Sequence, residues 1–149
     1  MKSIVIYFSE SGNTKKAAEY IAEQTKSDIE RLSPVKPYPK DYDKLVEVSG
    51  DELDNDVYPE IKNQISFDNY DTIYLGYPTW YHQAPMIIHS FFDKFDLKNK
   101  TVIPFTTTYS SPFSESEPFI KKMVINKGIE LKRGFRANSN SEINKYFSK

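Results

Sequence analysis

Short apolar runs alternate with amphipathic helical patterns along almost the whole chain, and this alternation constrains its fold more than any other feature. Residues 4–8 form a continuous β-branched and aromatic run, which is typical of a strand buried on both faces of a parallel sheet. Small polar residues at 9–13 end this run. From Thr14 the pattern becomes helical, because four apolar residues between 17 and 22 fall on one stripe among charged neighbours.

The same alternation continues to the end of the sequence. Further strands are predicted at residues 28–32, 71–76, 101–105 and 129–135. Further helices are predicted at residues 42–53, 86–95, 117–126 and 141–147, although Gly50 weakens the first of them. Five strands separated by helices predict an α/β fold, a doubly wound five-stranded parallel sheet with helices on both faces. The length of 149 residues fits one domain, so residues 1–149 are expected to form a single domain.

Composition excludes several classes of function. The absence of cysteine excludes disulfides, thiolate nucleophiles, iron–sulfur ligation and cysteine-based zinc sites. The two histidines, His82 and His89, have no metal-ligand spacing, so no metal is predicted. Twenty basic and 21 acidic residues give a net charge of -1, which predicts no nucleic-acid partner. The amino-terminal apolar run is too short for a signal peptide or a membrane span, which predicts a cytoplasmic protein that does not bind membranes.

The loop after the first predicted strand has the composition of a phosphate-binding loop. It offers three hydroxyl groups and a glycine that permits close approach of a ligand to the backbone. The following helix would present unpaired N–H groups at its positive dipole end. An ordinary helix cap of Ser and Asn would have a similar composition, so both interpretations stay open. The residues concerned are Ser9, Ser11, Gly12, Asn13 and Thr14.

Two other loops are expected to meet this one. In a doubly wound sheet, ligands bind outside the carboxyl ends of the strands, at the point where the strand order reverses. Residues 77–85 and 106–116 follow predicted strands, so both loops lie at that edge. A high aromatic content of 15% exceeds what a core of this size requires and leaves room for a planar ligand.

These motifs resemble those of the flavodoxin family. The first loop matches the family's Thr/Ser-x-Thr/Ser-Gly-Asn-Thr signature for the phosphate of flavin mononucleotide (FMN). Residues 70–81, followed by Ala84 and Pro85, resemble short-chain flavodoxin-like proteins with a Gly-Tyr-Pro-x-Trp-Trp segment. Residues 100–105 are similar to the next strand of those proteins, and residues 38–42 to the linker before their second helix. The resemblance covers nearly the whole chain and implies noncovalently bound FMN.

The resemblance also implies which residues contact the cofactor. The flat flavin ring needs an aromatic face, for which Trp80, Tyr81 and Tyr109 are candidates, although Trp80 could instead be a core residue. His82 could donate a proton to the flavin or a substrate, or lie on the surface as a solvated residue. No catalytic residue is predicted. The cofactor-binding residues expected beyond the first loop are Pro78, Thr79, Trp80, Tyr81, His82, Thr106, Thr107, Thr108, Tyr109 and Ser110.

The loop beside the expected ring departs from the family pattern. Relatives often have glycine where His82 stands, and residues 77–85 contain none. All four residues at positions 79–82 (Thr79, Trp80, Tyr81 and His82) should resist positive φ angles. A peptide flip beside the flavin N5 atom is therefore expected to be restricted, which disfavours the one-electron semiquinone and favours two-electron reduction.

Two classes of function stay open. The first is an electron-transfer protein that holds FMN and docks on a redox partner protein. The second is an FMN-dependent NAD(P)H:quinone-type reductase with a small-molecule acceptor. The net charge of -1 weakens the first, because carriers of this family are strongly acidic, whereas no nicotinamide site is evident for the second. A phosphorylated receiver domain is excluded, since the first strand ends without paired acidic residues. The protein is expected to be a monomer or weak dimer.

Overall fold

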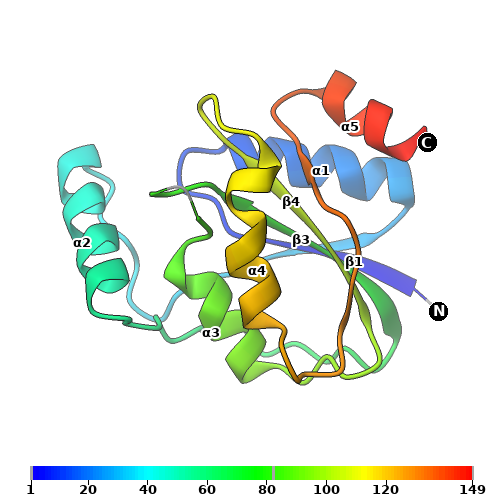
Figure 1. The fold of residues 1–149 in the computed structure, drawn as a ribbon, viewed down its shortest axis with the longest axis horizontal. Coiled ribbons are helices and arrows are strands. Elements are labelled where there is room, and N and C mark those ends of the chain that lie inside the picture. Colours follow the sequence, from blue (N-terminus) through cyan, green and yellow to red (C-terminus); the bar gives the residue numbers. More distant parts are fainter. Residues whose placement is uncertain (1, 82, 149) are drawn as a thin grey trace.

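A parallel β-sheet runs through the centre of the molecule (Figure 1). The computed structural model describes residues 2–81 and 83–148. The strands pair in the order β2-β1-β3-β4-β5, and a short β6 pairs with β4 beyond the end of β5. The order reverses at β1, so the predicted doubly wound sheet is confirmed. The strands are β1 (Lys2–Tyr7), β2 (Asp28–Arg31), β3 (Tyr70–Pro78), β4 (Thr101–Thr107), β5 (Glu130–Leu131) and β6 (Phe135–Arg136).

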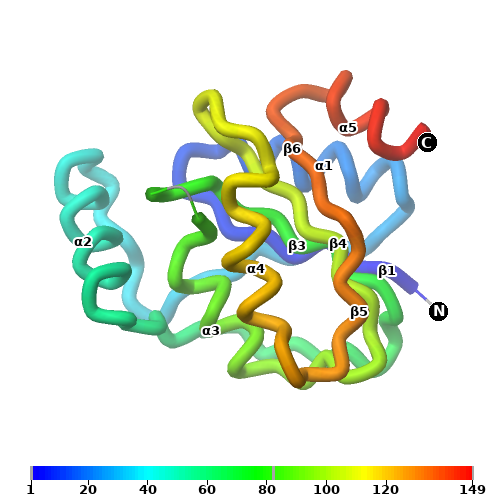
Figure 2. The backbone as a smooth tube through the Cα atoms, in the orientation of Figure 1, coloured from blue at the N-terminus to red at the C-terminus, as the bar shows by residue number. Residues whose placement is uncertain are grey.

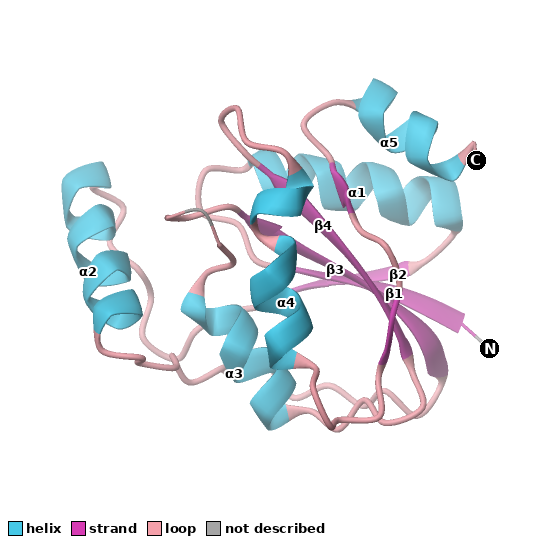
Figure 3. Ribbon diagram, viewed as in Figure 1, coloured by secondary structure: helices cyan, strands magenta, loops and turns pink. Residues whose placement is uncertain are grey.

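Helices cover both faces of this sheet (Figure 3). α1 and α5 lie on one face, α3 and α4 lie on the other, and α2 stands at one end of the molecule. None of the helices in the described residues is both long and apolar enough to cross a membrane. The helices are α1 (Asn13–Thr25), α2 (Tyr42–Asp54), α3 (Met86–Lys94), α4 (Glu117–Met123) and α5 (Asn140–Phe147), and a single 3₁₀ turn, η1 (Phe113–Glu115), precedes α4.

The continuous apolar run in β1 results from burial on both faces of the sheet. Val5 and Tyr7 belong to the apolar cluster under α1 and α5, whereas Ile6 and Phe8 belong to the cluster under α3 and α4. Successive side chains of a strand point to opposite faces, so each of these four residues is enclosed by a different layer from its neighbour. This arrangement requires apolar residues at every position of the doubly buried part, and residues 4–8 meet that requirement, whereas Lys2 and Ser3 at the start of β1 are not buried.

The predicted final strand at residues 129–135 is split into β5 and β6. β5 pairs with β4 at Thr101 and Val102, and β6 pairs with it at Phe105 and Thr106. The break lies opposite Pro104, whose nitrogen has no hydrogen to donate to a neighbouring strand. The chain passes this point through Gly134, where a Cβ would lie 2.3 Å from the Pro104 carbonyl oxygen. The interruption therefore results from the proline in β4.

β4 extends two residues further than predicted. Thr106 and Thr107, expected in the loop at residues 106–116, belong to the strand and pair with Tyr77 and Pro78 of β3. Their neighbours account for the longer strand, because β3 also continues to Pro78 and offers backbone partners along its full length. Both threonines are buried, so their polar side chains wrongly indicated that the strand ends before them.

Replacement of Gly134 by alanine should destabilise the fold. The added Cβ would lie 2.3 Å from the Pro104 oxygen and 2.4 Å from the Phe113 ring, and the backbone atom cannot move aside at low cost. We expect Gly134→Ala to lower the free energy of unfolding by about 1–3 kcal/mol in a urea titration. Lys132→Ala, at an exposed position in the same connection, serves as the control and should change it little. Equal stability of Gly134→Ala and the unmodified chain would contradict this packing.

Candidate functional site

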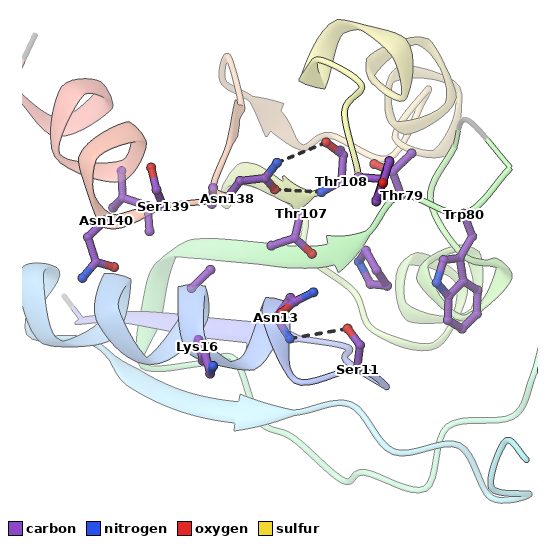
Figure 4. A pocket seen from close by; sticks show the side chains of 15 residues that line it. Ser11, Asn13, Lys16, Thr79, Trp80, Thr107, Thr108, Asn138, Ser139 and Asn140 are labelled. Atoms are coloured by element: carbon purple, nitrogen blue, oxygen red, sulfur yellow. Dashed lines mark hydrogen bonds between the residues drawn. The ribbon is translucent and has the colours of Figure 1, made fainter. Parts of the chain in front are cut away.

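The carboxyl ends of β3 and β4 lie near the starts of α1 and α5 (Figure 2). A cavity of about 570 Å³ opens there, between side chains from these elements (Figure 4). Cofactor and small-molecule sites commonly have volumes of about 300–1,000 Å³. Figure 4 shows side chains from both helices and both strands around one space. The lining residues are Ser11, Asn13, Lys16, Ala17, Pro78, Thr79, Trp80, Thr107, Thr108, Tyr109, Ala137, Asn138, Ser139, Asn140 and Ile143.

The predicted site residues divide into two groups around this cavity. Eight of them line it, namely Ser11, Asn13, Pro78, Thr79, Trp80, Thr107, Thr108 and Tyr109. Six others lie outside the lining, namely Ser9, Gly12, Thr14, Tyr81, Thr106 and Ser110. The predicted contact through His82 falls outside the described residues.

The β1–α1 loop is organised by its own hydrogen bonds. The Gly12 N–H donates to the Ser9 hydroxyl (3.1 Å), and Ser9 is buried. Gly12 itself has a φ of +93°, a left-handed conformation that favours glycine. The Ser11 hydroxyl accepts from the Asn13 N–H at 3.5 Å (Figure 4), at the first residue of α1. Ser9 and Gly12 thus shape the loop, while Ser11 and Asn13 face the cavity.

A pair of threonine hydroxyls joins this loop to β4. Thr14 Oγ1 and Thr107 Oγ1 lie 2.7 Å apart, and both residues are buried. The Thr107 carbonyl oxygen accepts from the Thr79 N–H at 2.8 Å, which joins β3 to the same point. One strand end therefore holds the first two loops of the site together.

Arg31, at the end of β2, supports the first loop from behind. Its guanidinium donates to the Ser9 carbonyl oxygen (2.5 Å) and lies 3.8 Å from the Glu10 carboxylate. Burial raises the pKa of the Glu10 carboxyl, and the nearby Arg31 charge opposes that rise. Arg31 is not among the site residues predicted from the sequence, because its contact joins two segments that lie 22 residues apart.

Thr106 supports the site without reaching the cavity. Its hydroxyl donates to the Tyr77 carbonyl oxygen (2.8 Å) and lies 2.7 Å from the Thr79 hydroxyl. The Thr106 side chain is fully buried and lies outside the cavity lining, unlike the other threonines predicted beside it, Thr107 and Thr108. The reason is the extra length of β4, which turns every second side chain into the core.

Trp80 lies between the cavity and the aromatic core. Its indole lines the cavity and also packs edge-on against two core aromatic rings, Phe8 at 5.5 Å and Tyr38 at 5.7 Å. The Tyr38 hydroxyl donates to Glu52 Oε1 (2.6 Å), and burial together with this bond raises the pKa of Tyr38. Burial also raises the pKa of the Glu52 carboxyl, which the same bond opposes. The indole is therefore held by the core on the side away from the cavity.

The expectation that Tyr81 resists a positive φ is wrong. Tyr81 has a φ of +52°, in the left-handed region that non-glycine residues rarely adopt. It sits in a tight turn in which Trp80 and Gln83 exchange two backbone hydrogen bonds, of 2.9 and 3.0 Å. Its hydroxyl donates to the Val46 carbonyl oxygen of α2 at 2.7 Å. Tyr81 thus points to α2, whereas its neighbour Trp80 lines the cavity.

The third loop meets the cavity through Thr108 and Tyr109. The Thr108 N–H donates to Asn138 Oδ1 (2.8 Å), and the Thr108 hydroxyl donates to the Ser111 carbonyl oxygen (2.7 Å). Tyr109 is fully exposed beside the cavity mouth, where its ring is available to a ligand. The Ser110 carbonyl oxygen accepts instead from Arg136, so Ser110 is directed to β6.

The residues at the start of α5 form one wall of the cavity, and they were not among the site residues predicted from the sequence. Asn138, Ser139 and Asn140 line the cavity opposite Lys16 of α1 (Figure 4). Ser139 caps α5, since its hydroxyl accepts from the Glu142 N–H at 3.2 Å. The Asn and Ser residues at 138–140 are typical of a helix N-terminus, so their composition was a usable indication that a helix begins there. Their proximity to α1 follows from the sheet order and not from any local pattern.

The lining is polar and carries little charge. Among the described residues that surround the cavity, Lys16 is the one with a charged side chain. The described part of the chain also contains no group of three or more His, Cys, Asp or Glu residues that could hold a metal ion. Hydroxyls, amides and the N-terminus of α1 therefore supply most of the binding chemistry, and they suit a polar ligand with an anionic group.

Comparisons with known proteins agree with this geometry. The family profile described as Flavodoxin matches residues 2–148. A Bacteroides eggerthii protein provisionally described as a flavoprotein is 30% identical, with 99% of this chain and 96% of that chain covered and a TM-score of 0.88. A similarly described Bacteroides uniformis protein is 31% identical, with 99% and 98% covered and a TM-score of 0.86. A Lactobacillus acidophilus flavoprotein solved in complex with FMN is 25% identical, with 99% of both chains covered and a TM-score of 0.83. Among curated proteins no match was found.

The contribution of the paired Thr14 and Thr107 hydroxyls to stability can be tested in the protein without a ligand. Thr14→Val preserves the shape of the side chain but leaves the buried Thr107 hydroxyl without its partner. We expect the free energy of unfolding to fall by about 1–3 kcal/mol in a urea titration. Thr14→Val/Thr107→Val removes both polar groups and should recover much of that loss. Additive losses in the double variant would show that the two hydroxyls do not stabilise each other.

Proposed function

This chain belongs to the flavodoxin family, and on that premise we propose that it binds FMN noncovalently in the cavity and transfers electrons through it. The observation that carries the proposal is the meeting of three loops around one polar cavity at the carboxyl ends of β3 and β4. The solved Lactobacillus acidophilus relative that contains FMN supports the identity of the cofactor.

The residues present fit the chemical groups of FMN. The β1–α1 loop presents hydroxyls and the N-terminus of α1, a combination suited to a phosphate monoester. Lys16 adds one positive charge beside that helix end. Trp80 and Tyr109 offer aromatic faces at the outer part of the cavity, where a flat ring would be held. The main-chain and side-chain amides of residues 138–140 supply further polar contacts.

Bound FMN would supply the redox chemistry, because its ring accepts and releases electrons. The chain's own residues would bind and orient it. Ser11 and Asn13 would donate hydrogen bonds to the phosphate, while Thr79 and Thr108 would fix the loops on either side of the ring. Trp80, backed by Phe8 and Tyr38, would exclude water from one side of the ring.

Charge distribution favours a protein as the redox partner. Residues 41–60 contain eight acidic residues and one lysine, whereas residues 121–149 contain eight basic residues and two acidic ones. The net charge of -1 for the whole chain therefore combines an acidic segment, residues 41–60, with a basic segment, residues 121–149. α2, in the acidic segment, is exposed along most of its length and contacts the turn at Tyr81. An acidic surface beside the ring site would steer a basic partner to it.

Selectivity for the phosphate group tests the cofactor proposal. Titration with FMN and with riboflavin, followed by flavin absorption and by fluorescence of Trp80, the single tryptophan, should give at least about tenfold tighter binding of FMN. Ser11→Ala should weaken FMN binding and leave riboflavin binding unchanged, because the Ser11 hydroxyl, which lines the cavity, would donate to the phosphate. Equal affinities for the two flavins would remove the phosphate loop from the proposal.

Ionic strength tests the partner proposal. With the FMN-loaded protein, we expect electron transfer to a basic redox protein to slow as salt rises, and transfer to an acidic one of similar potential to be slower at low salt. Glu47→Lys on α2 should reduce the rate with the basic partner, whereas Glu23→Lys on α1 serves as the distant control. Equal effects of both variants would contradict docking at α2. Rapid NAD(P)H oxidation with a quinone, insensitive to Glu47→Lys, would favour the reductase instead.

A further inference from the structure

The turn that carries Trp80 has a backbone conformation that its own sequence does not favour. Trp80 and Gln83 each donate a backbone N–H to the other's carbonyl oxygen, at 2.9 and 3.0 Å, and Tyr81 follows Trp80 with a φ of +52°. Tight hairpin turns with a positive φ at this position prefer Gly, Asn or Asp. A tyrosine in this position requires an external contact to hold it.

Helix α2 supplies that contact. The Tyr81 hydroxyl donates to the Val46 carbonyl oxygen at 2.7 Å, although the side chain is 43% exposed. The approach depends on Gly50, one turn further along α2, where a Cβ would lie 3.1 Å from the same hydroxyl. Glycine is among the poorest formers of a helix interior, so its presence here has a cost in helix stability. Gly50 and the left-handed Tyr81 are two locally unfavourable features that meet at one hydrogen bond.

A second hydrogen bond joins the same helix to Tyr38, whose ring packs against Trp80. The Tyr38 hydroxyl donates to Glu52 of α2 at 2.6 Å, and the Tyr38 ring packs against the indole with 5.7 Å between centroids. The space left between α2 and the turn is only about 10 Å³, close to the volume that one water needs. The turn and α2 are therefore packed together, and Trp80 lies between α2 and the main cavity.

We propose that Tyr81 and Gly50 are positioning residues for the flavin site: their contact fixes the turn so that Trp80 forms one wall of the cavity. This inference rests on the proposed binding of FMN in that cavity. Tyr81 itself lies outside the cavity lining and acts through Trp80. A wall held in place before binding removes the cost of ordering it when the ring enters, so the contact strengthens binding without touching the ligand.

Two measurements on Tyr81→Phe test the contact. In the protein without flavin, hydrogen exchange at the Trp80 and Gln83 amides should become faster, because the turn loses its tether while its ring stays in place. In the FMN-loaded protein, FMN should dissociate about three- to tenfold faster, the range that one hydrogen bond can account for. Tyr42→Phe, on the same helix with a 75% exposed side chain, is the matched control and should change neither measurement.

Gly50→Ala separates positioning from helix stability. Alanine favours the helix, but its Cβ would displace the Tyr81 hydroxyl by a few tenths of an ångström and lengthen its bond to Val46. FMN should therefore dissociate faster from Gly50→Ala even though the unfolding midpoint does not fall. Val48→Ala, at an exposed position of α2, also favours the helix but should leave dissociation unchanged. In the Tyr81→Phe background, where no hydroxyl remains to be displaced, Gly50→Ala should have no further effect on dissociation.

The outcomes distinguish this inference from the proposed function. Independent, multiplicative effects of Gly50→Ala and Tyr81→Phe on FMN dissociation would overturn the positioning role, as would unchanged hydrogen exchange in Tyr81→Phe. Failure of the unmodified chain to bind FMN would instead overturn the proposed function. The hydrogen-exchange comparison would still decide whether the Tyr81 contact holds the turn.

Discussion

Thr107, at the end of β4, is the junction on which the candidate site depends. Its hydroxyl pairs with Thr14 of α1, and its carbonyl oxygen accepts from Thr79 after β3. The next residue, Thr108, donates its N–H to Asn138 before α5. Four segments that are distant in the sequence are thus connected by hydrogen bonds at one strand end. Loops held by a buried strand can present polar groups at fixed positions, which is the general requirement for binding a cofactor selectively.

Backbone conformations that most residues avoid occur at both ends of the site. Gly12 has a φ of +93° in the loop before α1, where glycine adopts it at no steric cost. Tyr81 has a φ of +52° in the turn after Trp80, where a bond to α2 compensates for it. A positive φ is therefore allowed at Gly12 because glycine has no side chain, and at Tyr81 because a hydrogen bond to α2 holds it.

Local sequence patterns predicted the sheet and most of the first loop, and missed features that depend on distant neighbours. The apolar run of β1 and the apolar stripe of α1 are local properties, and the structure contains both elements with these residues buried. The split of the last strand depends on Pro104 in the adjacent β4, and the burial of Thr106 depends on the length of β3. The Tyr81 conformation depends on a helix 35 residues away in the sequence. None of these three features has a signature within its own segment.

The same distinction applies to charge. A net charge of -1 describes the chain as a whole, whereas docking and steering depend on where the charges lie. The acidic residues concentrate in and around α2, which stands at one end of the molecule (Figure 1). The contact between α2 and the Trp80 turn therefore supports the proposed protein partner, although the net charge of the whole chain is close to zero.

The most direct test of the account is an amide NMR titration of the uniformly labelled protein with FMN. If the three loops and the start of α5 form one site, the largest shift changes will occur together in residues 11–14, 79–80, 107–109 and 138–140. The groove on the α5 side, lined by Tyr74, Lys132 and Phe147, should be unaffected. Changes centred on that groove, with the β1–α1 loop unmoved, would contradict the central claim that Thr107 assembles a flavin site.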